Sequence, residues 1–303
     1  MTYGGSDRPT KNERREAARE KARQLREEQR RRERRNKFLI QGGVIVAVVA
    51  IVALIGTLIW QNIQPEGPGP RNMASDGIVY DVGMVPVETT ALEPDEAPTA
   101  TVQDESGTIA NIVTYVDYLC PFCGQFETTN GDQIRTMVES GAATIEIHPV
   151  AILTNRSAGS QYSLRAANAA GCVADASPEQ FYDFNALLFA NQPEEGTTGL
   201  SNDELKALAA EAGASSLSSI EQCIDDTEFK GWVQDATNRF LSEPIPNSDI
   251  ETQQRGTPTV VVNGKQYTGS LTDPAEFASF VLQATADTYT EATATPTPEP
   301  DDE

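Results

Sequence analysis

Two cysteines separated by two residues, Cys120 and Cys123, are the residues of this sequence best suited to chemistry. A C-x-x-C pair can form half of a zinc site, exchange a disulfide with other thiols, or arise by coincidence. A structural zinc site needs four close Cys or His ligands. The remaining candidates, Cys172, Cys223 and the single histidine His148, lie far along the chain. The composition therefore favours a redox-active pair without a bound metal.

The sequence around the pair predicts a strand that leads directly into a helix. Residues 108–116 are β-branched and apolar, as expected of a buried strand, and a helix is expected from Pro121 to about Ser140. The first cysteine then lies at the helix N-terminus, where unpaired N–H groups and the macrodipole stabilise a negative charge. Because the thiolate is the nucleophile in disulfide exchange, we expect Cys120 to be the attacking thiol. Cys123, one turn further on, is expected to be the buried resolving thiol.

The residues between and before the cysteines bear on the direction of this chemistry. A stabilised Cys120 thiolate stabilises the reduced protein, which makes the disulfide form a stronger oxidant. Pro121 suits the first turn of a helix, and Phe122 adds bulk without a side-chain hydrogen-bond donor. An inward-facing Asp117 would raise the pKa of a nearby thiol. The dipeptide Pro121-Phe122 therefore predicts a moderate oxidant, weaker than one with a donor at position 122.

Strand and helix patterns alternate along the rest of the chain, which is typical of an α/β fold. The helical block is broken at turns, and the hairpin after it contains the turn Asn263-Gly264. The expected elements are an extended lead-in strand or pair (78–87), a strand (143–147), a helical block (157–241), a hairpin (259–268) and a last helix (274–286). The order is β, β, α, β, a helical block, β, β, α.

The active-site sequence also resembles that of a known family. The run Val116-Asp117-Tyr118-Leu119-Cys120-Pro121-Phe122-Cys123-Gly124-Gln125-Phe126 is similar to the redox centre of the DsbA-like thioredoxin family. Thr257-Pro258 resembles its cis-proline loop, and the helical block lies where that family carries an insertion. The resemblance implies a thioredoxin fold with an inserted helical domain. It also implies that Thr257 and Pro258 face the disulfide and bind an extended substrate segment, although an ordinary strand-entry proline is the alternative.

The resemblance carries expectations about function. It implies oxidation of cysteine pairs in secreted proteins, with no cofactor, and re-oxidation by a quinone-linked membrane partner. Phe122 stands where the best-studied oxidases have histidine, and a threonine such as Thr257 also occurs in isomerases and reductases. A reductase or isomerase of the same fold is therefore an alternative. An alternative of another class is a membrane-tethered binding module with an inert Cys120–Cys123 bridge.

Cys172 and Cys223 both lie on predicted helices of the block at about 157–241. An even number of cysteines in an exported domain indicates disulfide chemistry, so we expect a structural disulfide between these two. A relay pair that exchanges with the redox centre and a pair of free buried thiols are the alternatives. His148 ends a predicted strand and is interpreted as a local hydrogen-bonding or packing residue.

Residues 38–60 form an uncharged, aliphatic run of 23 residues. At ~1.5 Å per residue a helix of this length spans roughly 35 Å, enough for a bilayer core of about 30 Å. Residues 1–37 hold fourteen Lys/Arg and seven Asp/Glu, whereas the rest of the chain holds nine and thirty-eight. The positive-inside rule therefore predicts a single-pass anchor in membrane lipid, with residues 1–37 cytoplasmic and the catalytic domain outside. A buried core helix and a cleaved signal peptide with a shorter apolar stretch fit less well.

Composition sets the expected boundaries of the exported domain. Residues 61–75 are rich in Pro and Gly and predict a linker, and residues 289–303 are rich in Thr, Pro and acid and predict a disordered tail. The DsbA-like domain is expected over 76–288. The basic stretch within 1–37 is interpreted as a solvated juxtamembrane helix, and the acidic domain gives no support for nucleic-acid binding.

Overall fold

A computed structural model gives the structure of the chain, which divides into two compact units, Met1–Pro65 and Glu66–Glu303. The described residues are 19–21, 23, 26–27, 29–32, 43, 48–54, 67–94, 96–248, 250–251 and 255–294. Residues 48–54 of the first unit are helical, and the rest of the predicted anchor 38–60, except Gly43, lies outside the described residues. Within the described part of the chain, no helix is both long enough and apolar enough to cross a membrane.

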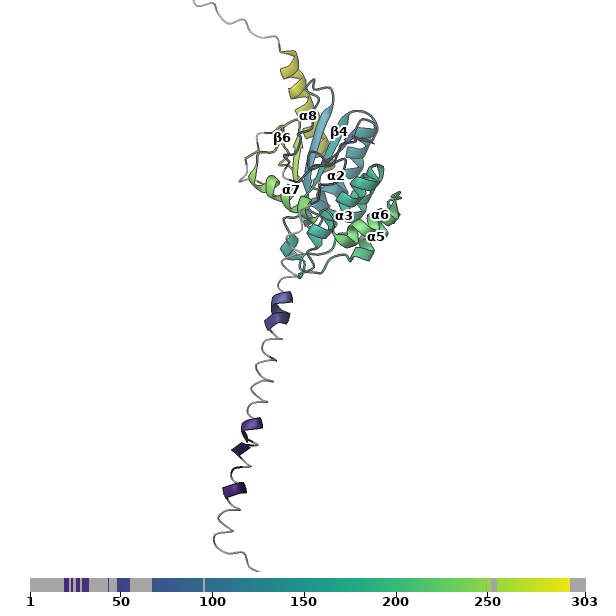
Figure 1. Cartoon of the computed structure of the whole chain (residues 1–303). Coiled ribbons are helices and arrows are strands. Elements are labelled where there is room, and N and C mark those ends of the chain that lie inside the picture. The colour runs from purple at the N-terminus through teal and green to yellow at the C-terminus, as the bar shows by residue number, and fades with distance from the viewer. Residues whose placement is uncertain are drawn as a thin grey trace, which may run out of the picture. The chain divides into compact units, whose positions relative to one another are not determined.

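A six-stranded sheet in the order β2-β1-β4-β3-β5-β6 forms the centre of the second unit (Figure 1). The two central strands, β3 and β4, run parallel, and every other neighbouring pair is antiparallel. Helix α2 connects β3 to β4, so these three elements form a βαβ unit. The strands are β1 (Ile78–Asp81), β2 (Val85–Pro86), β3 (Ala110–Val116), β4 (Ala143–Pro149), β5 (Thr259–Val262) and β6 (Lys265–Gln266).

Helices cover the sheet and form the predicted helical block. In Figure 1, α3, α5 and α6 lie together at the end of this unit away from α8, and the three helices contact one another. The helices are α2 (Pro121–Glu139), α3 (Tyr162–Ala176), α4 (Phe181–Ala190), α5 (Asn202–Glu211), α6 (Leu217–Asp226), α7 (Lys230–Ser242) and α8 (Pro274–Thr293), with short 3-10 turns η1 (Thr154–Arg156) and η2 (Pro178–Gln180).

Apolar side chains are buried on both faces of the central strands, because helices cover one face and loops with α7 cover the other. On the first face Ile112 of β3 belongs to the large core that includes Phe126 of α2 and Phe277 of α8. On the second face Tyr115 packs in a smaller cluster with Phe240 of α7. This double burial explains why β3 does not alternate between apolar and exposed polar residues: every residue of the strand is buried.

The structure differs from the sequence prediction at both ends of the domain. Residues 67–75, predicted as linker, pack onto the domain: Met73 is fully buried, and Gly69 N donates to Leu92 O at 2.7 Å. At the other end α8 continues through Tyr289 to Thr293, where a disordered tail was predicted. The linker prediction for residues 67–75 was wrong because proline and glycine report local backbone preference but not the contacts that order a segment.

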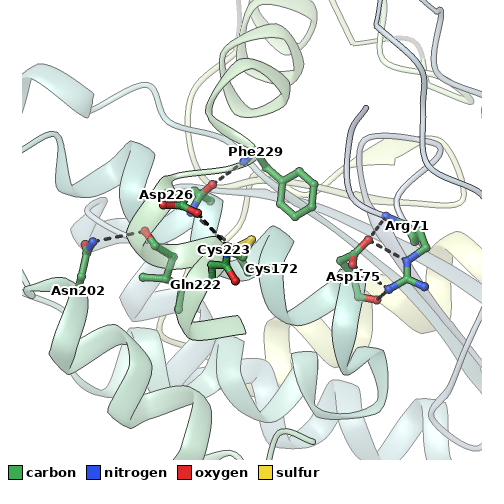
Figure 2. Close-up of a disulfide and its surroundings, with 10 residues drawn as sticks. Arg71, Cys172, Asp175, Asn202, Gln222, Cys223, Asp226 and Phe229 are labelled. Carbon is green, nitrogen blue, oxygen red and sulfur yellow. Dashed lines mark hydrogen bonds and ion pairs between the residues drawn. A yellow bond between two sulfur atoms is a disulfide. The ribbon is translucent and has the colours of Figure 1, made fainter. Parts of the chain in front are cut away.

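The helical block is joined internally by a disulfide between Cys172 of α3 and Cys223 of α6, with Cα atoms 5.9 Å apart. Figure 2 shows this bond together with the ion pair between Arg71 and Asp175, which lies one turn further along α3. Both cysteines are buried. The disulfide and the ion pair therefore fix α3 to α6 on one side and to the N-terminal segment on the other.

Replacing both Cys172 and Cys223 with alanine is expected to lower the free energy of unfolding by about 4 kcal/mol, because the bond closes a loop spanning 51 positions. Urea unfolding of the full chain followed by tryptophan fluorescence measures this loss. The folded double variant is expected to keep its thiol–disulfide activity. A folded variant that had lost this activity would instead favour the relay role.

Candidate active site

The turn between β3 and α2 places Cys120 at the start of a helix. Cys120 is the N-cap residue of α2, with extended dihedral angles (φ −77°, ψ 116°), and Pro121 is the first helical residue. The carbonyl of Cys120 accepts the first helical hydrogen bond, from Gly124 N at 3.2 Å. Cys120 and Cys123 are both free thiols in this structure, and both are buried. The sulfur of Cys120 thus lies where the amide groups of the first turn are unpaired.

A second chain segment completes the site. The Thr257–Pro258 peptide bond is cis, and the Cys120 Sγ lies 3.1 Å from the carbonyl oxygen of Thr257, to which the thiol donates. Strand β5 begins at Thr259 and pairs with β3, with Thr259 opposite Tyr115. This register brings the loop before β5 to the end of β3, next to the cysteine.

The surroundings of Cys120 favour its thiolate. A hydrogen bond from the Cys123 thiol is the main cause that lowers the pKa of Cys120 to about 6. The side chain of Thr257 and the backbone N–H groups of Cys123 and Phe122 lower it further, while burial opposes them. Because the thiolate is the reactive form, Cys120 is largely activated at neutral pH.

Cys123 is held in the opposite state. Burial, followed by the neighbouring Cys120, raises the pKa of the Cys123 thiol well above its ordinary value. The backbone N–H of Asp117 points to the Cys123 Sγ at 3.5 Å and only partly offsets this. Cys120 therefore has the lowered pKa that a nucleophile needs, whereas Cys123 has the raised pKa of a resolving thiol that stays protonated.

Asp117 is fully buried, but its hydrogen bonds go to the backbone and to a neighbouring helix. One carboxylate oxygen accepts from Leu119 N at 2.9 Å, and the other accepts from Leu153 N at 2.8 Å and from the Ser163 hydroxyl at 2.7 Å. Burial nevertheless raises the pKa of Asp117. The carboxyl group thus ties the loop before Cys120 to η1 and α3.

Phe122 is exposed, with 58% of its surface accessible, and Pro121 beside it is also exposed. The ring of Phe122 gives no hydrogen bond to either thiol, whereas the backbone N–H of Phe122 is among the groups that lower the pKa of Cys120. The dipeptide therefore acts on the thiolate through the backbone and presents an apolar side chain to solvent.

Comparison with known proteins identifies the family. The family model described as Thioredoxin matches residues 97–281, more than half of the chain. Two solved structures from Mycobacterium tuberculosis are 28% identical to the chain, each with a TM-score of 0.51. The reduced disulfide bond oxidoreductase DsbG covers 73% of this chain and 96% of its own, and reduced DsbA covers 72% and 100%. The chain belongs to the DsbA-like thioredoxin family.

Membership of this family makes the protein a thiol–disulfide oxidoreductase. The thiol–disulfide oxidoreductase MdbA from Corynebacterium diphtheriae, at 16% identity and a TM-score of 0.51, shares the fold and covers 73% of this chain and 96% of its own. No curated protein sequence matches the chain significantly.

His148, the only histidine, lies in β4 and contacts residues of the sheet. Its Nε2 is 3.1 Å from Glu146 Oε1, and its ring stacks on Tyr115 with centroids 4.3 Å apart. Glu146 also accepts hydrogen bonds from the Ser75 and Thr101 hydroxyls. These are the contacts of a packing residue of the DsbA-like domain. In the described ranges, His, Cys, Asp and Glu side chains do not gather into a group that could hold a metal ion.

Three polar residues of the site were not anticipated from the sequence. Glu127 lies one turn after Cys123, where burial raises the pKa of its carboxyl to about 7. Arg255, two residues before Thr257 of the cis-proline loop, donates to the backbone carbonyls of Phe240 and Ile250. Gln192 binds the backbone of the active-site loop. The four-residue spacing from Cys123 in the sequence could have indicated Glu127. No local sequence pattern indicates Arg255 or Gln192.

Proposed function

We propose that this DsbA-like protein oxidises cysteine pairs of secreted proteins through a Cys120–Cys123 disulfide. The observation that carries the proposal is the asymmetry of the two thiols, in which the pKa of Cys120 is lowered to about 6 and that of Cys123 is raised. A stabilised thiolate favours the reduced enzyme and therefore drives electrons from the client into Cys120–Cys123.

In the proposed reaction a client thiolate attacks Cys120 Sγ of the enzyme disulfide. The new bond is a mixed disulfide at Cys120, and Cys123 leaves as a thiolate that takes a proton. A second client thiolate then attacks the client sulfur of the mixed disulfide, and Cys120 leaves as a thiolate. The client loses two electrons and gains a disulfide, while the enzyme becomes the dithiol. We propose that a membrane-bound oxidase re-oxidises the dithiol and passes the two electrons to a quinone.

Thr257 and Pro258 are proposed to bind the client segment next to its cysteine. Both residues are partly exposed, and the Thr257 carbonyl lies 3.1 Å from the Cys120 Sγ. A backbone carbonyl at this distance can accept a hydrogen bond from an extended client chain once a client sulfur reaches Cys120. Recognition through the backbone is independent of client side chains, which suits an enzyme with many clients.

The site of action is proposed from the sequence. Residues 38–60 would anchor the protein in membrane lipid, with residues 1–37 in the cytoplasm and the DsbA-like domain outside. The disulfide between Cys172 and Cys223 supports an oxidising compartment, because such bonds rarely persist in the cytosol.

Mixing the oxidised full-length protein, in detergent, with a reduced and unfolded two-cysteine client tests the proposal. We expect loss of two client thiols per enzyme disulfide, and a reduction potential above the ~−270 mV of thioredoxin. A protein lacking both Cys120 and Cys123 is the control and should leave the client reduced. A potential at or below that of thioredoxin would favour the reductase alternative, and an inert disulfide would favour the binding module.

A further inference from the structure

Gln192, which follows α4 within the helical insertion, reaches back to the redox centre. It follows α4 and its C-cap residue Asn191, and its backbone N–H donates to Phe189 O at 3.2 Å. Its side-chain Nε2 donates to Cys120 O at 2.9 Å and to Tyr118 O at 3.1 Å. A primary amide has two N–H donors, so one side chain satisfies two carbonyls of the active-site loop.

Gly124 makes room for this amide. A Cβ atom at position 124 would lie 2.4 Å from Gln192 Oε1, much closer than real Cβ atoms approach other heavy atoms. Glycine inside a helix is unfavourable relative to alanine by roughly 0.5–1 kcal/mol. The residue directly after Cys123 thus has no side chain at the point where the Gln192 amide lies against α2.

The rest of α4 supports the same loop. Asn185 and Phe189 of α4 are spaced by four residues, so they share one face of the helix, and Gln192 follows just after its C-cap residue. The Tyr118 hydroxyl donates to Asn185 Oδ1 at 3.0 Å, and the rings of Tyr118 and Phe189 have centroids 5.1 Å apart. Helix α4 therefore holds Tyr118 by its side chain, and Gln192 just after the helix holds Cys120 by its backbone.

We propose that Gln192 is a positioning residue for Cys120, and that through it the helical insertion sets the stability of the active-site thiolate. The inference rests on the proposed role of Cys120 as the redox nucleophile. The carbonyl of Cys120 begins the hydrogen bonding of α2, and the N–H groups of Phe122 and Cys123 in the first turn of that helix stabilise the Cys120 thiolate. The Gln192 amide also directs its positive end towards this residue.

Removing the amide is therefore expected to weaken the thiolate. The variant Gln192→Met keeps the length of the side chain but has no N–H donor. Losing a hydrogen bond of this kind typically changes an equilibrium constant roughly twofold to thirteenfold. We expect the pKa of Cys120 to rise, and the equilibrium constant for oxidation of glutathione by the enzyme disulfide to fall by about that factor.

The measurement uses the full chain in detergent. The Cys120 pKa is read from thiolate absorbance near 240 nm, the exchange equilibrium from defined ratios of reduced and oxidised glutathione, and the melting temperature from circular dichroism. Asn191→Ala is the matched control, because Asn191 is adjacent and, among the described residues, its side chain donates to Leu187 O of the preceding helix and not to the active-site loop. This control is expected to leave both the pKa and the equilibrium constant unchanged.

A second variant tests the same contact from the other side. Gly124→Ala places a methyl group against the Gln192 amide and should displace it, with the same direction of change in the Cys120 pKa. If both variants act through one contact, their effects on the pKa are not additive, and the double variant resembles Gln192→Met. Fully additive effects would contradict a shared contact.

The outcomes distinguish this inference from the proposed function. If the wild-type protein exchanges disulfides normally and Gln192→Met changes only the melting temperature, then Gln192 has a purely structural role. That result would overturn the inference. Wild-type protein whose Cys120 titrates near ~8.5 and does not exchange would overturn the proposed function itself.

Discussion

Replacing Cys123 with alanine is expected to turn the protein into a trap that holds clients on Cys120. Oxidised glutathione charges Cys120 of this variant, and a client thiolate then displaces the glutathione to give a mixed disulfide. Because Cys123 is the only other thiol placed to attack Cys120, the adduct persists once it has formed on a client with one cysteine. Non-reducing electrophoresis and mass spectrometry measure the trapped fraction, which should approach one client per protein.

Cys120→Ser is the matched variant for this experiment. It keeps Cys123 but removes the activated sulfur, and the remaining thiol is buried with a raised pKa. We expect no adducts and a loss of client oxidation of at least about a thousandfold, since without Cys120 no Cys120–Cys123 disulfide can form for a client thiolate to attack. Adducts that form on Cys123 as readily as on Cys120 would show that the roles of the two sulfurs have been assigned wrongly.

The reactivity of reduced Cys120 is expected to titrate near pH 6, because hydrogen bonds from Cys123, Thr257 and backbone amides lower its pKa to about that value. The rate of alkylation by iodoacetamide should rise about tenfold per pH unit below pH 6 and level off above it. The same protein unfolded in urea should titrate near ~8.5 and provides the control. A midpoint near 8.5 in the folded protein would mean that the fold does not stabilise the thiolate.

This shift also predicts how the stability of the reduced protein depends on pH. A pKa that is lower in the folded state than in the unfolded state adds stability as pH rises, and this contribution is lost as pH falls through about 6. The raised pKa of Cys123 has the opposite sign and lowers stability once the unfolded thiol ionises. Between about pH 6 and 9, reduced wild-type protein should therefore gain stability relative to Cys120→Ser, as measured by urea unfolding.

The sequence by itself determined the location and the chemistry of the redox pair. A β-branched apolar run, a C-x-x-C pair and a helix-forming stretch report local preferences, and the structure has β3 ending at Val116 and α2 beginning at Pro121. The same kind of local pattern predicted the hairpin of β5 and β6 and the helical block. These features depend on residues within a few positions of one another, so a single sequence is sufficient to predict them.

The resemblance to a known family indicated Thr257 and Pro258, but only the tertiary structure decided how distant groups contact Cys120. Thr257 is 137 positions away and Gln192 is 72 positions away, and each reaches the site through the packing of β5 on β3 or of α4 on α2. For the same reason, composition did not reveal that Met73 is buried in a segment that resembles a linker. Periodicity and composition describe a chain one segment at a time, whereas these contacts depend on which segments the hydrophobic core brings together.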